Sequence, residues 1–217
     1  MVTWGPAMKP QFFTFDIFGT VLDWRRGMAD SVRAAGAKFD EAVDFDRIVD
    51  LQGVDEQRGY RSYAEIARDS LVVGCGLPVE AAARVGRDAG CWPLFADSAI
   101  ALKKLMAVAP CVAMTNSDRA HGEQVRAQLG FELTDWVCAE ESGVYKPAAE
   151  FWHYVARKHG VEFGRHWWHV SAYADYDLSV AQDLGLTCVF VDRPHAREGF
   201  SHVRVQDLAE LAIITPV

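Results

Sequence analysis

Asp16 is the residue of this chain best placed to do chemistry, because it ends a short apolar and aromatic segment. The segment Phe12–Phe15 has the composition of a buried strand, and Gly19 and Thr20 follow as a turn and a nearby hydroxyl. In open α/β sheets, ligands bind in the crevice outside the carboxyl ends of the strands. We therefore expect the Asp16 carboxylate to face a ligand, which makes it a candidate nucleophile.

Three later loops carry polar side chains at the corresponding place, directly after a strand-like segment. Because the loops after parallel strands emerge at one edge of a sheet, we expect these groups to meet Asp16. An isolated aspartate at a strand end more often forms a turn, but several such groups in this order favour a site. The side chains expected to converge are Asp16, Thr20, Thr115, Asn116, Ser117, Lys146, Asp175 and Asp177.

The elements that position these residues are predicted by periodicity and by helix and turn signals. Helical segments alternate with strand-like ones, which predicts an α/β fold with a doubly wound parallel sheet of five strands. The expected strands are Phe12–Phe15, Cys111–Met114, Trp136–Ala139, Trp167–Ser171 and Cys188–Val191. The expected helices follow Asp97, cover Asp118–Leu129, run from Pro147 to Gly160, and run from Asp177 to Gly185.

A charged segment, residues 25–92, interrupts this alternation. Apolar residues recur there at helical spacing, for example Tyr63, Ile66 and Leu71. We predict a small helical domain over residues 25–92, inserted after the first strand and folded over its carboxyl end. Residues 1–24 and 93–217 would then form the core domain.

The composition limits the classes of partner. The chain has 217 residues, of which 50% are hydrophobic, and a formal net charge of -8. This charge argues against binding to nucleic acid or to an anionic membrane, and no apolar segment approaches the length of a membrane span. Five widely spaced cysteines and the lack of a secretory signal favour a cytoplasmic protein with reduced thiols. The oligomeric state is left open, a homodimer included.

Taken together, the motifs resemble the haloacid dehalogenase (HAD) superfamily over nearly the whole chain, with the helical insertion in the position of that family's cap. Five residues match the motifs in order: Asp16, Thr20, Thr115, Lys146 and Asp177. The resemblance implies a Rossmann-like core. It also implies a hydrolase in which Asp16 attacks the substrate and forms an ester that water then cleaves.

Phe18 points to one branch of this superfamily. Phosphatases of the superfamily have an aspartate at this position as the acid for the leaving group, whereas 2-haloacid dehalogenases have an aromatic residue there. The resemblance therefore implies displacement of halide from a small 2-halo carboxylic acid, an anionic substrate. Lys146 would keep Asp16 ionised by lowering its pKa. Asn116 would donate to halide or substrate carboxylate, and Asp177 would orient Lys146 or the hydrolytic water.

The resemblance thus assigns two sets of residues to the site. The implied catalytic residues are Asp16, Thr20, Lys146 and Asp177. The implied substrate contacts are Phe18, Gln52, Thr115, Asn116, Ser117 and Tyr173.

The chain departs from the dehalogenase pattern at several positions. The arginine that grips halide or carboxylate in the family has no clear counterpart, and Leu51 and Gln52 lie near its place. Trp152 replaces a tyrosine of the family, and the acidic motif lacks its asparagine. Other substrates of the same aspartate chemistry, a phosphate monoester or a strained ring, therefore stay open. A non-catalytic binding protein with this fold is the third alternative.

No metal or other cofactor is expected, because the dehalogenases that the chain resembles work without one. A phosphatase-like reaction would instead require Mg²⁺, because phosphate oxygens need charge neutralisation. Its candidate ligands are Asp16, Asp175 and Asp177.

Two further segments are interpreted as structural. His166–His169, with two tryptophans between two histidines, is interpreted as core aromatic residues with histidines at the edge. Asp192–His195 is interpreted as a surface turn, and an Arg193 that reaches toward an anionic substrate is the minor alternative.

Overall fold

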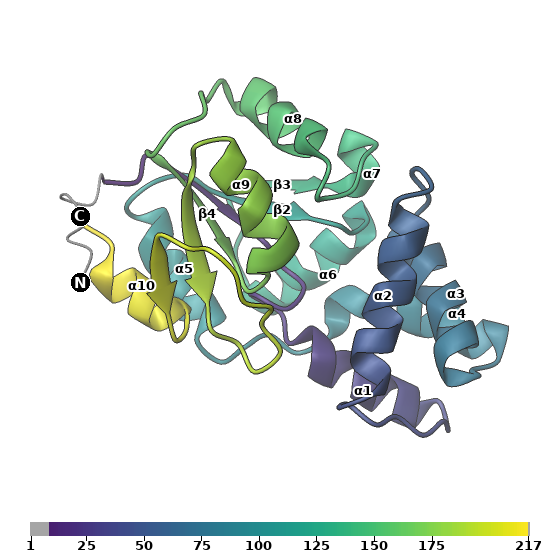
Figure 1. Cartoon of the computed structure of the whole chain (residues 1–217). Helices are drawn as coiled ribbons and strands as arrows, with labels where there is room; N and C mark the ends of the chain where they lie inside the picture. Colours follow the sequence, from purple (N-terminus) through teal and green to yellow (C-terminus); the bar gives the residue numbers. More distant parts are fainter. Residues whose placement is uncertain (1–8, 217) are drawn as a thin grey trace.

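A six-stranded parallel sheet forms the centre of the molecule (Figure 1). The computed structural model describes residues 9–216. The strands lie in the order β3-β2-β1-β4-β5-β6, and every pair of neighbours is parallel. They are β1 (Phe12–Phe15), β2 (Cys111–Thr115), β3 (Asp135–Cys138), β4 (Trp167–Ser171), β5 (Thr187–Val191) and β6 (Val203–Val205).

The predicted doubly wound sheet is confirmed, but the expected number of five strands is wrong. Each of the five predicted strands lies within one residue of its expected bounds, and β6 is the sixth strand. β6 has three residues at the edge of the sheet, and its central Arg204 is exposed and paired with Asp192 and Glu198. A segment of three residues is too short to show the alternation of apolar and polar residues by which strands are predicted.

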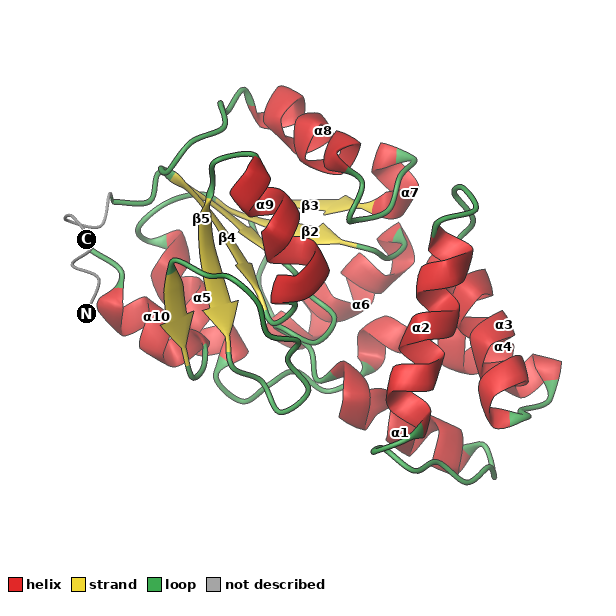
Figure 2. Cartoon of the chain, viewed as in Figure 1, coloured by secondary structure: helices red, strands yellow, loops and turns green. Residues whose placement is uncertain are grey.

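Helices cover both faces of the sheet (Figure 2). Side chains of one face, such as Phe12, pack against α8 and α9, and those of the other, such as Phe13, against α5, α6 and α10. The helical elements are α5 (Ser98–Met106), α6 (Arg119–Leu129), α7 (Ala139–Ser142), α8 (Ala149–His159), α9 (Ser179–Asp183) and α10 (Leu208–Ile214), with the π-helical turn η2 (Ala174–Leu178) before α9.

Two of the predicted helix starts are wrong. The helix expected to begin at Pro147 begins at Ala149, after a cis peptide bond between Lys146 and Pro147. The helix expected to open at Asp177 is preceded by η2, so that Asp177 lies within a π-helical turn. Within residues 9–216, no helix is both long enough and apolar enough to span a membrane.

The segment between β1 and α5 is helical, and we call residues 24–91 the helical insertion. It lies beside the carboxyl ends of the central strands (Figure 1). Its longest helices are 13 residues each, and one of them begins with a capping box formed by Ser62 and Glu65. The helices are α1 (Trp24–Ala34), α2 (Asp44–Glu56), α3 (Tyr63–Cys75) and α4 (Val79–Arg87), followed by the short 3-10 helix η1 (Ala89–Cys91).

Polar contacts fasten the helical insertion to the loops of the sheet. The Asp118 carboxylate, which precedes α6, accepts hydrogen bonds from the first backbone N–H groups of α3, those of Tyr63 at 2.8 Å and Ala64 at 2.9 Å. A carboxylate at a helix N-terminus is favoured both by the free N–H groups and by the helix dipole. α2 is joined to these loops by ion pairs of Arg197 with Asp46 and Asp50, and by a hydrogen bond between Glu56 and Asn116.

Gly27 allows α1 to approach the returning chain closely, which generates a stability prediction. A Cβ at this position would lie 2.2 Å from two atoms of Trp92. We expect Gly27→Ala to lower the free energy of unfolding by about 1–3 kcal/mol, the usual cost of overpacking. Gly53→Ala in α2 is the matched control, because nothing lies within 4 Å of its added Cβ. The control is expected to gain up to about 1 kcal/mol from helix propensity. Urea unfolding measures both variants, and a neutral Gly27→Ala would contradict the packing.

Candidate active site

Asp16 follows β1, and both of its carboxylate oxygens are held by hydrogen bonds. Oδ1 accepts from Lys146 Nζ at 3.0 Å, and Oδ2 accepts from the Thr20 hydroxyl at 2.7 Å. The Thr20 hydroxyl in turn accepts a hydrogen bond from the Ala172 N–H at 2.9 Å. The loop after β4 therefore fixes the orientation of this hydroxyl. The side chain of Asp16 is consequently fixed by groups from the ends of neighbouring strands.

The turn between Asp16 and Thr20 has its own supports. Gly19 has φ +99°, and a Cβ there would lie 2.5 Å from the Tyr173 hydroxyl, so that conformation and space both require glycine. Arg193 is buried and donates twice to the Thr20 carbonyl, at 3.1 and 3.0 Å, while a bidentate pair with Asp97 holds its guanidinium. The interpretation of Arg193 as part of a surface turn is wrong. Arg193 holds the turn at Thr20 by these hydrogen bonds and does not line the pocket.

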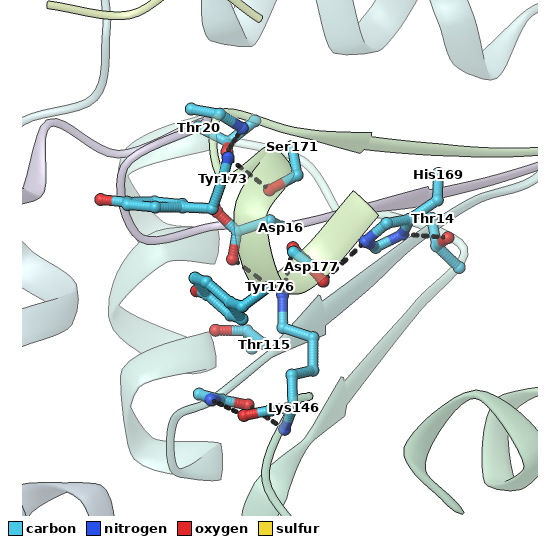
Figure 3. A network of polar contacts seen from close by, with 12 residues as sticks. Thr14, Asp16, Thr20, Thr115, Lys146, His169, Ser171, Tyr173, Tyr176 and Asp177 are labelled. Carbon is cyan, nitrogen blue, oxygen red and sulfur yellow. Dashed lines mark hydrogen bonds and ion pairs between the residues drawn. The ribbon is translucent and has the colours of Figure 1, made fainter. Parts of the chain in front are cut away.

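Lys146 lies between two buried carboxylates (Figure 3). Its ammonium is 3.0 Å from Asp16 Oδ1 and 2.9 Å from Asp177 Oδ2, and the exposed fractions of Lys146, Asp16 and Asp177 are 1%, 4% and 0%. These three residues come from the loops after β3, β1 and β4. The predicted convergence of the strand ends is therefore realised in the geometry.

A chain of hydrogen bonds continues behind Asp177 (Figure 3). Asp177 Oδ1 contacts His169 Nε2 at 2.9 Å, His169 Nδ1 contacts the Thr14 hydroxyl at 2.7 Å, and Trp167 Nε1 donates to that hydroxyl at 2.8 Å. An indole N–H only donates and a carboxylate only accepts. In a neutral ring, Nε2 carries the hydrogen that faces Asp177, and the Thr14 hydroxyl donates to Nδ1. The interpretation of His169 as a histidine at the edge of the core is wrong, because it is completely buried within this network.

Burial and charge together set the protonation of the three central groups. Burial raises the pKa of Asp16, Lys146 lowers it, the charge of Asp177 raises it, and the balance lies above the ordinary value. For Asp177, burial also raises the pKa, but Lys146 and His169 bring it below the ordinary value. Burial lowers the pKa of Lys146, and the two carboxylates more than restore it. The expected effect of Lys146 on Asp16 is thus present but is outweighed by burial, and Asp16 is the more basic carboxylate.

A pocket of about 810 Å³ opens in front of Asp16, between the strand ends and the helical insertion. Of the predicted substrate contacts, four line it: Phe18, Gln52, Thr115 and Asn116. Ser117 and Tyr173 do not line it. Ser117 is buried and accepts from the Thr115 hydroxyl, and Tyr173 is buried against Gly19.

Two of the lining residues have contacts that the sequence did not predict. The Asn116 amide nitrogen donates to the Lys146 carbonyl at 2.9 Å and to the Glu56 carboxyl at 3.0 Å, and its oxygen accepts from the Lys146 N–H at 2.7 Å. Both of its amide hydrogens are therefore engaged within the protein, and the expectation that they bind the substrate is not met here. Phe18 lies edge to face with the rings of Trp24, Trp92 and His121, so it forms an apolar wall.

Sequence reasoning missed three residues of this region, which are His169, Glu56 and Tyr176. The sequence predicted the strand that carries His169, but its pairing in register with Thr14 on β1 is visible only in the structure. Tyr176, which lies within η2, lines the pocket, whereas the expected Tyr173 does not. Glu56 had no local signal, because its place depends on how α2 packs.

The residues present do not form a magnesium site. The Lys146 ammonium occupies the space between Asp16 and Asp177, and Asp175 is directed toward Arg197 at 3.9 Å. Across residues 9–216, no three His, Cys, Asp or Glu side chains gather so that they could hold a metal ion. The set Asp16, Asp175 and Asp177 therefore does not fit Mg²⁺ in this arrangement.

The fold and this constellation define a hydrolase family. The profile of the haloacid dehalogenase-like hydrolases matches residues 11–185, and the chain belongs to this family. No curated protein is significantly similar in sequence to the chain.

Several solved structures share the fold. One is a defluorinating L-2-haloacid dehalogenase, with a TM-score of 0.80 and 20% identity over 95% of each chain. Another L-2-haloacid dehalogenase has a TM-score of 0.79 and 22% identity over 94% of this chain and 97% of its own. The enzyme from Xanthobacter autotrophicus, solved with chloropropionic acid covalently bound, has a TM-score of 0.80 and 17% identity over 94% of this chain and 98% of its own.

The pairing of one ammonium with two buried carboxylates predicts a stability effect that depends on pH. Lys146→Met leaves Asp16 and Asp177 uncompensated and should lower the free energy of unfolding by about 3–5 kcal/mol at pH 8. Without the ammonium, both carboxyl pKa values rise above those of the unfolded chain. The variant therefore takes up protons as the pH falls, and its loss should be smaller at pH 5 than at pH 8. Urea unfolding at the two pH values measures this difference.

Lys158→Met is the matched control, because Lys158 also bridges two carboxylates, those of Asp135 and Glu141, but at the surface. It should cost about 1 kcal/mol or less. Equal losses for the two lysine variants, or a Lys146→Met loss that does not vary with pH, would refute the assignment of Lys146 as the buried counter-ion.

The hydrogen-bond chain also predicts the tautomer of His169. In nitrogen-15 NMR spectra of the histidine rings, His169 should be the Nε2–H form, with a protected hydrogen on Nε2 and an unprotonated Nδ1. His169→Gln assigns the signal by its disappearance. Thr14→Val should shift Nδ1, which loses its donor. Observation of the Nδ1–H tautomer would reverse the direction of the chain that ends at Asp177.

Proposed function

We propose that the protein hydrolyses small 2-halo carboxylic acids with Asp16 as the nucleophile. The observation that carries this proposal is the presence of Phe18, rather than an acid, two residues after Asp16. A carboxylate fixed at both oxygens faces the pocket, and the side chain two residues later is an apolar wall rather than an acid. Halide departs without a proton, whereas an alkoxide requires one at neutral pH.

The reaction proceeds in two balanced steps. An Asp16 oxygen attacks the carbon that bears the halogen, a carbon–oxygen bond forms, and halide leaves with the electron pair of the broken bond. Water then attacks the carboxyl carbon of the resulting ester, releases the 2-hydroxy acid, and returns Asp16 as a carboxylate. The net products are the hydroxy acid, halide and one proton.

The neighbouring groups support the nucleophile in different ways. Lys146 and Thr20 hold the two Asp16 oxygens, which orients the carboxylate for attack. Asp177 has both oxygens engaged, by Lys146 and His169, and does not line the pocket. We therefore assign it to orienting Lys146 rather than the hydrolytic water. Similarity in fold to L-2-haloacid dehalogenases adds support to this type of chemistry.

The alternative of a phosphate monoester substrate is less well supported by the site. The position of the leaving-group acid holds Phe18, and the carboxylates do not fit a magnesium ion. No specific observation favours a strained ring or a purely binding role, and both are outcomes that the experiments below distinguish.

Release of halide tests the proposal directly. With 2-chloropropionate and a panel of haloacetates, the purified protein should release halide in the presence of EDTA, and Asp16→Asn should fall to the uncatalysed rate. In a single turnover in oxygen-18 water, the hydroxy acid should contain unlabelled oxygen taken from Asp16, and later turnovers should label it. Immediate labelling of the product would indicate direct attack by water.

Absence of halide from the whole panel would refute the dehalogenase proposal. Phosphate release that depends on Mg²⁺ would instead establish the phosphatase alternative. Absence of all turnover, with ligand binding unchanged in Asp16→Asn, would establish a binding protein.

A further inference from the structure

Glu56 brings a carboxyl group from the helical insertion into the pocket. It is the last residue of α2, it is half-buried, and it lines the same cavity as Asp16. Its Oε2 accepts a hydrogen bond from the Asn116 amide at 3.0 Å, and Asn116 is itself fixed by two hydrogen bonds to the Lys146 backbone. The carboxyl of Glu56 is therefore anchored to the loops of the sheet and is not a mobile surface group.

The contact with Asn116 defines where a proton would lie on this group. The Asn116 amide nitrogen can only donate, so Oε2 is the accepting oxygen. In the neutral acid the hydrogen then lies on Oε1, for which residues 9–216 offer no hydrogen-bond partner. A neutral Glu56 thus presents one unused donor at the pocket.

Among the described residues, both cations that line the pocket are already paired with carboxylates. The lining cations are Lys146, bound between Asp16 and Asp177, and Arg197, paired with acidic residues of α2 and with Asp175. Six of the residues that line the pocket are aromatic. Its aromatic residues are Phe18, Trp24, Tyr60, Tyr63, Tyr145 and Tyr176.

Glu56 is one titratable carboxyl group that faces the pocket, and Asp16, whose pKa also lies above its ordinary value, is another. Burial raises its pKa to about 8, against the lowering effects of the Asn116 bond and the Lys146 charge. The other titratable groups around it are Lys146, Tyr63, Tyr145 and Tyr176, from four separate positions of the chain. Burial raises the pKa of each of the three tyrosines, and the neighbouring carboxylates raise that of Lys146 above its ordinary value. None of these four groups therefore titrates between pH 6.5 and pH 9.5.

We propose that neutral Glu56 is the hydrogen-bond donor that holds the carboxylate of the substrate in this pocket. Oε1–H donates to the anion while Oε2 remains on Asn116, so the insertion supplies anion recognition without a positive charge. Ionised Glu56 cannot donate and repels the anion, so binding is lost as the pH rises. The proposal rests on the proposed function in that it takes a carboxylic acid as the substrate.

Binding of propionate, which has no halogen to lose, tests this separately from catalysis. We expect the dissociation constant of the wild-type protein, followed by tryptophan fluorescence or calorimetry, to rise about tenfold for each pH unit above the pKa of Glu56. Glu56→Gln is permanently neutral and can both accept from Asn116 and donate to the anion. It should bind propionate equally at pH 6.5 and pH 9.5. Asp55→Asn, which removes a carboxylate of α2 outside the pocket, should keep the wild-type pH dependence.

A measurement on the wild-type protein covers the case in which Glu56→Gln does not fold. In a carbon-13 NMR titration of the glutamate carboxyls, saturating propionate should raise the apparent pKa of Glu56, because only the neutral form binds the anion. Equal propionate affinity at both pH values, a retained pH dependence in Glu56→Gln, or an unmoved Glu56 titration would each overturn the proposal.

The two proposals fail in different ways. Halide release without a pH effect from Glu56 would leave the dehalogenase function standing and remove the role of Glu56. Propionate binding that depends on Glu56, in a protein that releases no halide, would remove the dehalogenase function and keep the anion site.

Discussion

The contact between the Lys146 ammonium and two buried carboxylates is the constraint on which the rest of this site depends. Three charges lie together with exposed fractions of 4% or less, where a missing partner would leave a carboxylate without compensation. This requirement explains why three loops must end at one place. β1, β3 and β4 each supply one member, and the sheet order around β1 sets the distances between them.

Behind Asp177, hydrogen bonds extend from this contact into the sheet through His169 and Thr14. Thr14 and His169 lie opposite one another on adjacent strands, and Trp167 closes the chain with a group that only donates. On the other side of Asp16, the Thr20 hydroxyl donates to the Asp16 carboxylate and accepts from the backbone N–H of Ala172. Each carboxylate oxygen of Asp16 and Asp177 accepts a hydrogen bond from a group of the network. Buried polar groups are costly unless they are hydrogen-bonded, and these contacts supply the partners.

Residues that follow strand ends could be predicted from the sequence, and residues placed by tertiary packing could not. Asp16, Lys146 and Asp177 were found because parallel strands end at one edge, a rule that needs no knowledge of distances. The three-residue β6 and the π-helical turn η2 escaped because both are local departures from regular periods. Glu56 escaped because its position depends on the packing of α2. The sequence predicted that Asn116 lies at the site but not its hydrogen bonds within the protein, because one of them is to Glu56 on α2.

The helix α2 has an evolutionary consequence. Gln52 and Glu56 are one helical turn apart on it, and both line the pocket, whereas the Lys146 network is built by the loops after the strands. A point mutation at either position changes the wall of the pocket, and an apolar substitution at Glu56 also removes a hydrogen bond from Asn116. In evolution, this part of the pocket wall can vary with one helix, while the strand ends that hold Asp16, Lys146 and Asp177 stay unchanged.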